Sequence, residues 1–254
     1  MDGVSTTSAE ARVRLLSSRG EPLFLADWLR VLMMHFEVDP RALQRDVPFA
    51  LDLWNGRAFV SLVAFTFQRL RPRRFERLGG WLFKPVASHD FLNFRTYIHH
   101  NGEPGIHFVA EWLSSRLASK LGPSTFGLPY RFSRIRYDHD DAAGRFGGEI
   151  SDGAGGTILR YRGCARGREK PCACARHSLE EWLMERYTAF NCIQGKRKFF
   201  RIWHETWSQI GISTQVDSDS RIYRDWPWFR EAVPCGANYS RGFRDVWMGR
   251  PHRA

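Results

Sequence analysis

The residues best suited to chemistry lie on one short segment, where Asn93, Arg95, Tyr97 and His99 alternate with mostly apolar residues. Alternate residues of a strand point to the same side, so these four side chains share one face of a predicted strand. An arginine guanidinium forms two parallel hydrogen bonds to a carboxylate, and a tyrosine hydroxyl can orient the rest of a ligand. The pattern is compatible with a site for a ligand carboxylate, with Arg95 as its anchor.

This polar face has two interpretations. If it points into the protein, Arg95 needs an anion, because an unpaired buried charge costs several kcal/mol. Either Glu111 or the carboxylate of a bound ligand would supply that anion. If the face points to water, Arg95 and Glu111 form an ordinary ion pair across two strands.

A β-hairpin is predicted to place more polar groups opposite this face. Its parts are a strand over 91–99, a five-residue loop over 101–105 and a second strand over 106–113. A two-residue turn would set polar residues against apolar ones, so we expect the longer loop. In that register Arg95 faces Glu111. It also sets His99 opposite His107, and His107 joins the ligand-binding candidates.

Other titratable groups add one candidate and no metal site. His204 lies in an aromatic-rich segment and is either a general base or a satisfied structural histidine. His99 and His100 are adjacent on a strand, point to opposite sides and cannot bind one metal ion together. The cysteines around Cys172 and Cys174 lack the spacing of a zinc site and predict a loop with free thiols. We therefore expect neither a metal nor another cofactor.

The elements that must position these residues are mostly strands. Asn55-Gly56 predicts a tight hairpin turn, with Leu53 paired to Ala58 and the flanking strands continuing in that register. Short helices are predicted over 40–47, 115–121 and 179–187, after the capping residues Asp39, Ser114 and Ser178. Further strands are predicted over 128–137, 144–151, 157–163 and 198–207, and residues 24–38 mix helical and strand signals.

Together these elements predict an α+β protein. Its main part is an antiparallel β-sheet that forms a closed or half-closed barrel with a few short helices. We expect residues 1–21 to be a flexible leader and residues 22–212 to form the barrel domain. Residues 213–254 are predicted to be a tryptophan-rich extension that packs on the domain.

Composition limits the possible partners. The 254 residues carry a net charge of +11, and 33 of the 38 basic residues are arginines. These arginines are spread along the chain without a nucleic-acid-binding motif, so we predict no nucleic-acid partner. The chain lacks an apolar run of membrane-spanning length and a signal core, and its cysteines fit a reducing compartment, which predicts a cytoplasmic protein. The alternative to a ligand site is a non-enzymatic module that holds an acidic partner through its basic surface and tail tryptophans. A homo-oligomer is compatible with both.

Several ordered segments resemble one known family. They are His35–Pro40, Asp52–Val60, Asn93–Tyr97, Phe126–Tyr130, Glu185–Tyr187 and Trp203–Trp207. In this order and spacing they resemble the YqjF-like bacterial proteins, a domain-of-unknown-function (DUF) family. That family is similar, more distantly, to the acetoacetate decarboxylase superfamily, which implies a cone-shaped antiparallel barrel with helices at its rim.

The resemblance also implies where the chemistry differs. Decarboxylases of the superfamily use a lysine directly after a Gly-x-Pro segment to form a Schiff base. The matching segment is 127–129, and Tyr130 and Arg131 follow it. The resemblance thus implies no Schiff-base lysine here and adds Tyr130 and Arg131 to the ligand-binding candidates. With this fold, the expected ligand is a small organic acid or carbonyl compound anchored by Arg95. For an acid–base reaction of lyase or isomerase type, the catalytic candidates are Tyr130, Glu111 and His204.

Overall fold

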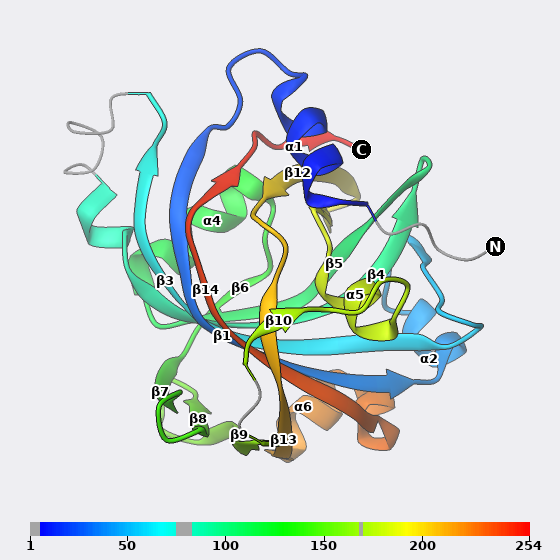
Figure 1. The fold of residues 1–254 in the computed structure, drawn as a ribbon, viewed down its shortest axis with the longest axis vertical. Helices are drawn as coiled ribbons and strands as arrows, with labels where there is room; N and C mark the ends of the chain where they lie inside the picture. Colours follow the sequence, from blue (N-terminus) through cyan, green and yellow to red (C-terminus); the bar gives the residue numbers. More distant parts are fainter. Residues whose placement is uncertain (1–5, 75–82, 168–169) are drawn as a thin grey trace.

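A computed structural model describes residues 6–74, 83–167 and 170–254, and strands dominate it (Figure 1). The long strands are β1 (Phe24–Val38), β3 (Ala58–Pro72), β4 (His89–His100), β5 (Glu103–Leu113), β13 (Ser208–Ser218) and β14 (Val233–Met248). The shorter ones are β2 (Ala50–Leu51), β6 (Tyr130–Phe132), β7 (Arg134–Asp140), β8 (Arg145–Ser151), β9 (Thr157–Ala165), β10 (Cys172–Ala173), β11 (Thr188–Ile193), β12 (Lys196–Trp203) and β15 (His252–Arg253). The helices are α1 (Ser8–Leu16), α2 (Pro40–Gln44), η1 (Lys84–Val86), α4 (Arg116–Phe126), α5 (Leu179–Met184), α6 (Ser220–Asp225) and η2 (Pro227–Glu231).

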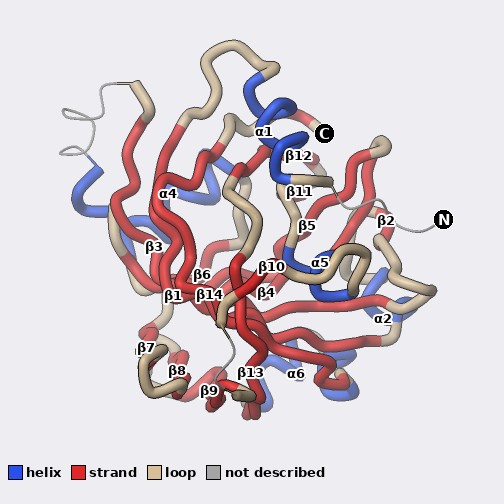
Figure 2. The backbone as a smooth tube through the Cα atoms, viewed as in Figure 1, coloured by secondary structure: helices blue, strands red, loops and turns tan. Residues whose placement is uncertain are grey.

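The strands join one sheet whose path returns on itself (Figure 2). Strands β12, β11, β5, β4, β3, β1 and β14 follow one another, and β12 also pairs with β14. Beyond β14, the sheet continues through β13, β9, β8 and β7. The prediction of a mainly β fold with few short helices is confirmed. The sheet is mixed rather than purely antiparallel, however, because β5 pairs in parallel with β11 and β6. The chain reaches β6 through α4, a crossover that returns it in the same direction.

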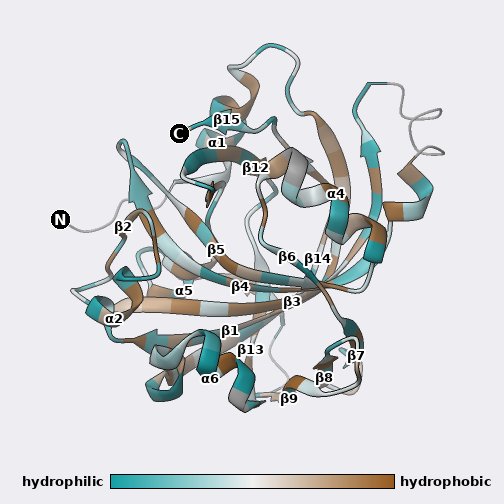
Figure 3. Cartoon of the chain, turned by 180° about the vertical axis from the view of Figure 1, so that it is seen from behind, coloured by the Kyte–Doolittle hydropathy of each residue, from teal (hydrophilic) through white to brown (hydrophobic). Residues whose placement is uncertain are grey.

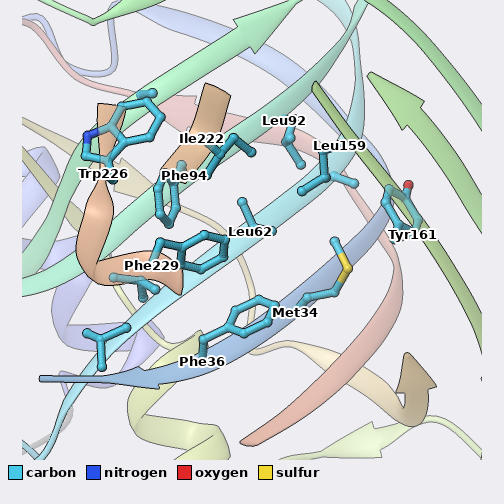
Figure 4. Close-up of a cluster of buried hydrophobic side chains, with 14 of the residues drawn as sticks. Met34, Phe36, Leu62, Leu92, Phe94, Leu159, Tyr161, Ile222, Trp226 and Phe229 are labelled. Atoms are coloured by element: carbon cyan, nitrogen blue, oxygen red, sulfur yellow. The ribbon is translucent and has the colours of Figure 1, made fainter. Parts of the chain in front are cut away.

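The central strands β1, β3 and β4 are buried on both sides. On one side, side chains from these strands pack against aromatic residues of the segment that runs from α6 to η2 (Figure 4). The cluster includes Phe36, Leu62, Leu92, Phe94, Trp226 and Phe229. On the other side, Met33, Phe65 and Phe91 face a second cluster. Burial on both sides requires apolar residues at nearly every position, which removes a simple alternation. This is why residues 24–38 gave mixed signals. Figure 3 shows β1 and β3 as largely hydrophobic and β4 as mixed.

The tight turn at Asn55-Gly56 is confirmed, but the strand pairing predicted beyond it is wrong. Both turn residues have positive φ, at 50° and 76°, as a type I′ turn requires. Strand β2 pairs with β4 and not with β3. Both edges of β3 are occupied by β1 and β4, so β2 pairs with the part of β4 that extends beyond β3.

The register predicted between β4 and β5 is also wrong. The hairpin closes with a two-residue turn and not with a five-residue loop. One extra residue, Val109, then forms a β-bulge, and beyond it Glu111 lies opposite Asn93 rather than Arg95. The prediction assumed an uninterrupted ladder, whereas a bulge inserts one residue and changes which side of the strand the following residues face.

Two of the three predicted helix starts are confirmed. Asp39 caps α2, and Ser178 caps α5 by accepting a hydrogen bond from a backbone amide. Helix α4 begins after Ser115 and is longer than predicted, because it continues through Pro123. Proline has a φ that suits a helix, and the Pro123 carbonyl accepts a hydrogen bond from Gly127, which ends the helix in the left-handed conformation.

Both terminal regions contact the sheet. Helix α1 lies inside the segment predicted as a leader, and Arg12 stacks over Trp203 and Trp247. Residues 213–254, predicted to be an extension, contribute part of β13 and all of β14, which pairs with β1 along most of its length. The tail residue Trp226 is only 7% exposed and packs inside the core. None of the helices in the described ranges is long and apolar enough to cross a membrane.

Candidate ligand-binding cavity

A cavity of about 310 Å³ lies on the other side of β1, β3 and β4 from the cluster of Figure 4. Helix α4, η1 and the strands β5, β12 and β14 complete its walls. Most of the lining is apolar. Its polar side chains are His89, Asn93, Arg95, Glu111, Tyr130, Arg186 and His204. The cavity therefore brings together five residues that the sequence had marked, from four different segments.

Strand periodicity places the first of these side chains. Along β4, alternate residues from His89 to Arg95 line the cavity, and Asn93 lies between Phe91 and Arg95 on the same side. Asn93 is 8% exposed and Arg95 is 7% exposed. Of the two interpretations of this polar face, the inward one is therefore correct for Asn93 and Arg95, whereas His99, near the end of β4, is exposed.

The bulge at Val109 determines which side chains of β5 face the cavity. Without it, every second residue from Glu111 would line the cavity, and Val109 would be next. With it, Phe108 and Ile106 follow Glu111 on the cavity side. The bulge that made the predicted register wrong therefore places Glu111 and two apolar side chains on the same side of β5.

Arg95 is a buried cation without an anion. One of its Nη atoms donates to the Leu183 carbonyl at 3.2 Å and lies 3.6 Å from the Met33 sulfur. Its Nε is buried and has no hydrogen-bond partner in the described part of the chain. Among the described ion pairs, none includes Arg95. The guanidinium thus presents a free hydrogen-bond donor at the cavity wall.

Glu111 does not neutralise this charge. Burial raises the pKa of Glu111 well above the ordinary value for glutamic acid, which favours the neutral, protonated form. Tyr130 lies beside Glu111 in parallel register, and burial followed by the Glu111 carboxyl raises the pKa of Tyr130. The Tyr130 ring needs Gly122 on α4, because a Cβ there would lie 2.0 Å from the ring. Two proton donors are therefore held side by side.

His204 is a neutral histidine in an aromatic cage. Its Nδ1 donates to the Glu205 carbonyl at 2.7 Å, which leaves Nε2 as an acceptor. Its ring stacks on Phe243 at 5.2 Å and contacts Tyr187 and Trp207 at 4.8 Å. Burial, and to a lesser extent the charge of Arg95, lowers the pKa of His204 to about 4. The imidazole can accept a hydrogen bond from a ligand but is a weak base.

Unsatisfied polar atoms concentrate around the cavity. Eleven buried side-chain nitrogen or oxygen atoms in the described residues have no hydrogen-bond partner, and seven belong to residues that line it. They are on Trp28, His89, Asn93, Arg95, Glu111, Arg186 and Trp207. Buried polar groups are normally paired, so this concentration is typical of a site that a ligand completes.

Three ligand-binding candidates are not among the residues that line the cavity. Tyr97 is fully buried deeper in the sheet, where its hydroxyl bonds to Ser61 at 2.6 Å. His107 bonds to the Phe190 carbonyl at 2.9 Å. Arg131 is exposed and pairs with Asp225 at 2.9 Å. No cluster of three or more metal-ligating side chains occurs within the described ranges.

Sequence reasoning missed Arg186, the second arginine of the cavity wall. It is 6% exposed, and its guanidinium pairs with Asp52 at 2.7 Å and donates to the Trp182 carbonyl. Both Asp52 and Arg186 lie in segments that carry the family resemblance, but 134 residues separate them. Only the fold shows that they form a pair.

The fold is that of the acetoacetate decarboxylase-like proteins. Acetoacetate decarboxylase from Legionella pneumophila matches with a TM-score of 0.66 at 10% identity, over 91% of this chain and 87% of that one. The enduracididine biosynthesis enzyme MppR gives 0.66 at 15% identity, over 91% and 89%. An acetoacetate decarboxylase-like enzyme from Sphingomonas wittichii RW1 gives 0.64 at 16% identity, over 92% and 93%. At these identities the likeness concerns the fold alone.

The chain itself belongs to the DUF2071 family of uncharacterized conserved proteins, whose sequence pattern matches residues 25–230. It is 28% identical over 199 residues to the uncharacterized protein YqjF of Bacillus subtilis (strain 168). That alignment covers 75% of this chain and 79% of YqjF. The predicted family resemblance is confirmed. No described residue that lines the cavity is a lysine.

Proposed function

We propose that the protein binds a small organic acid or carbonyl compound in this cavity and that Arg95 holds the ligand's carboxylate. The unpaired, buried guanidinium of Arg95 carries the proposal. A ligand carboxylate would occupy the free Nε and the remaining Nη donors in the bidentate geometry that arginine favours. It would also remove the cost of burying an unpaired charge.

The other polar groups suit an acid–base reaction of lyase or isomerase type. Protonated Glu111 and the Tyr130 hydroxyl would donate to a carbonyl or enol oxygen of the ligand. His204 would accept a hydrogen bond through Nε2. Without a lysine among the described lining residues, we propose no covalent intermediate. The neighbour MppR has been solved in complex with pyruvate, a small oxo acid, and this supports the proposed ligand class by analogy.

Thermal unfolding with a panel of carboxylic acids and their amides tests the binding. An acid at one hundred times its dissociation constant should stabilise the protein by about 2.7 kcal/mol. The substitution Arg95→Met should weaken binding about 10- to 100-fold, the range for a lost charge-assisted hydrogen bond. Arg131→Met is the matched control, since this arginine lies outside the cavity, and it should bind as the parent does.

Two results would overturn the proposal. One is that no acid in a panel of varied length shifts the unfolding temperature. The other is that Arg95→Met, still folded, keeps the full shift.

A further inference from the structure

The cavity changes character along its length. On β4 the residues that line it run from Arg95 through Asn93 and Phe91 to His89. The partners on β3 follow the same order, with Val63 opposite Asn93 and Phe65 opposite Phe91. A strand advances by about 3.3 Å per residue, so Arg95 and Phe91 are about 13 Å apart along the strand. On these two strands the lining passes from polar to aromatic over that distance.

The aromatic part is closely packed and continuous. Phe65 and Phe91 stack at 5.2 Å with an interplanar angle of 7°. Phe67 meets Phe91 edge-on at 5.6 Å, and Tyr130 contacts the same ring at 5.5 Å. Such rings offer flat, apolar contact to a ligand and few hydrogen bonds.

The aromatic part carries no unneutralised charge. The ionisable side chains described in the lining are His89, Arg95, Glu111, Tyr130, Arg186 and His204. Arg186 is neutralised by Asp52. Glu111 lies opposite Asn93, between the two ends, and its burial favours the uncharged, protonated form. At the aromatic end His89 is neutral, because burial lowers its pKa to about 4. A second charge on the ligand would therefore find no partner there.

We infer that the ligand is an amphipathic monocarboxylate, with its carboxylate at Arg95 and an apolar, preferably aromatic, body against Phe65 and Phe91. This inference rests on the proposed function, since it presupposes that Arg95 holds a carboxylate. It excludes the smallest acids as the best ligands. It also excludes dicarboxylates, whose second charge would lie among phenylalanine rings.

Calorimetric titration of the full chain with a graded series tests this class. The probes are acetate, butanoate, hexanoate and 3-phenylpropanoate, with adipate as the dicarboxylate matched to hexanoate. Affinity should rise about fourfold for each methylene until the chain reaches Phe91. Adipate should bind at least tenfold more weakly than hexanoate.

The variant Phe91→Gln separates the two ends of the cavity. It should weaken 3-phenylpropanoate about tenfold or more and leave acetate unchanged, so acetate reports that the variant is folded and its polar end intact. If this variant does not fold, the series on the parent protein decides alone. Affinity that is independent of chain length, or adipate equal to hexanoate, would overturn the inference and leave the proposed function standing. If no acid binds at all, both fail.

Discussion

Two buried arginines of this protein have similar surroundings and opposite electrostatics. Arg95 is 7% exposed and Arg186 is 6% exposed, and both guanidinium groups lie over the ring of Tyr97, at 5.9 and 5.2 Å. Arg186 has a carboxylate partner in Asp52, whereas Arg95 has only a carbonyl and a sulfur atom. Burial of an arginine therefore does not by itself separate a structural role from a functional one.

The two roles are distinguished by whether the arginine has a carboxylate partner. A paired buried arginine contributes to the native state, and removing it leaves its partner uncompensated. An unpaired one destabilises the native state unless an anion binds beside it. The contrast favours a structural role for Arg186 in the cavity wall and supports the proposed role of Arg95 as the ligand's anchor.

Replacing each arginine in turn tests this difference, and Arg186→Met should have the larger effect on stability. Arg186→Met should destabilise the protein by about 3–5 kcal/mol, because it leaves Asp52 without its buried partner. Arg95→Met removes a charge that has no partner, and it should be neutral or stabilising in the absence of ligand. Urea unfolding of both variants at neutral pH measures the difference. Equal losses in the two variants would mean that Arg95 is a structural residue.

The sequence predicted well those features that depend on neighbouring residues. Asn55 and Gly56 both tolerate positive φ, and Asp39 can cap a helix, so the turn and the start of α2 were recognised. The alternation of Asn93 and Arg95 with apolar residues identified the polar face correctly. These signals act over a few residues and do not depend on the rest of the fold.

The features that were not predicted correctly depend on distant parts of the chain. The bulge at Val109 has no marker in the sequence, so the β4–β5 register could not be predicted. Whether the polar face pointed inward depends on strands from both ends of the chain. Tyr97 shares that face with Arg95 but lies deeper in the sheet than the cavity. Alternation indicates which residues share a side, and only the fold shows where the cavity stops.

Glu111 and Glu103 are two carboxyl groups whose pKa values shift in opposite directions. Burial raises the pKa of Glu111, so the folded protein binds a proton that the unfolded chain has lost above the ordinary glutamate pKa of about 4.3. Stability must then fall as the pH rises from that value, by about 1.4 kcal/mol for each unit, until Glu111 ionises. Glu111→Gln should remove this fall and be more stable than the parent at neutral pH. Unfolding measured from pH 4 to pH 8 gives the slope.

Glu103 is the matched control for that slope. Burial alone would raise its pKa, but hydrogen bonds from Arg201 and Thr188 outweigh burial and lower it. The contribution of ionised Glu103 to the stability of the folded protein is present above the ordinary glutamate pKa. It is lost as the pH falls. Glu103→Gln should therefore destabilise the protein at neutral pH, the opposite of Glu111→Gln. If both variants change stability in the same direction, the distinction between the two carboxyl groups is wrong.

Arg131 is a third arginine, which is paired with a carboxylate but exposed. Its replacement should have the smallest effect on stability. It stacks over Trp226 at 5.0 Å and pairs with Asp225 at 2.9 Å on the outside of the protein. Surface ion pairs contribute about 0–1 kcal/mol and are screened by salt. Arg131→Met should therefore cost about 1 kcal/mol or less, and half a molar salt should reduce the difference from the parent. A loss as large as that of Arg186→Met would show that partnership with a carboxylate, and not burial, determines what an arginine contributes to this fold.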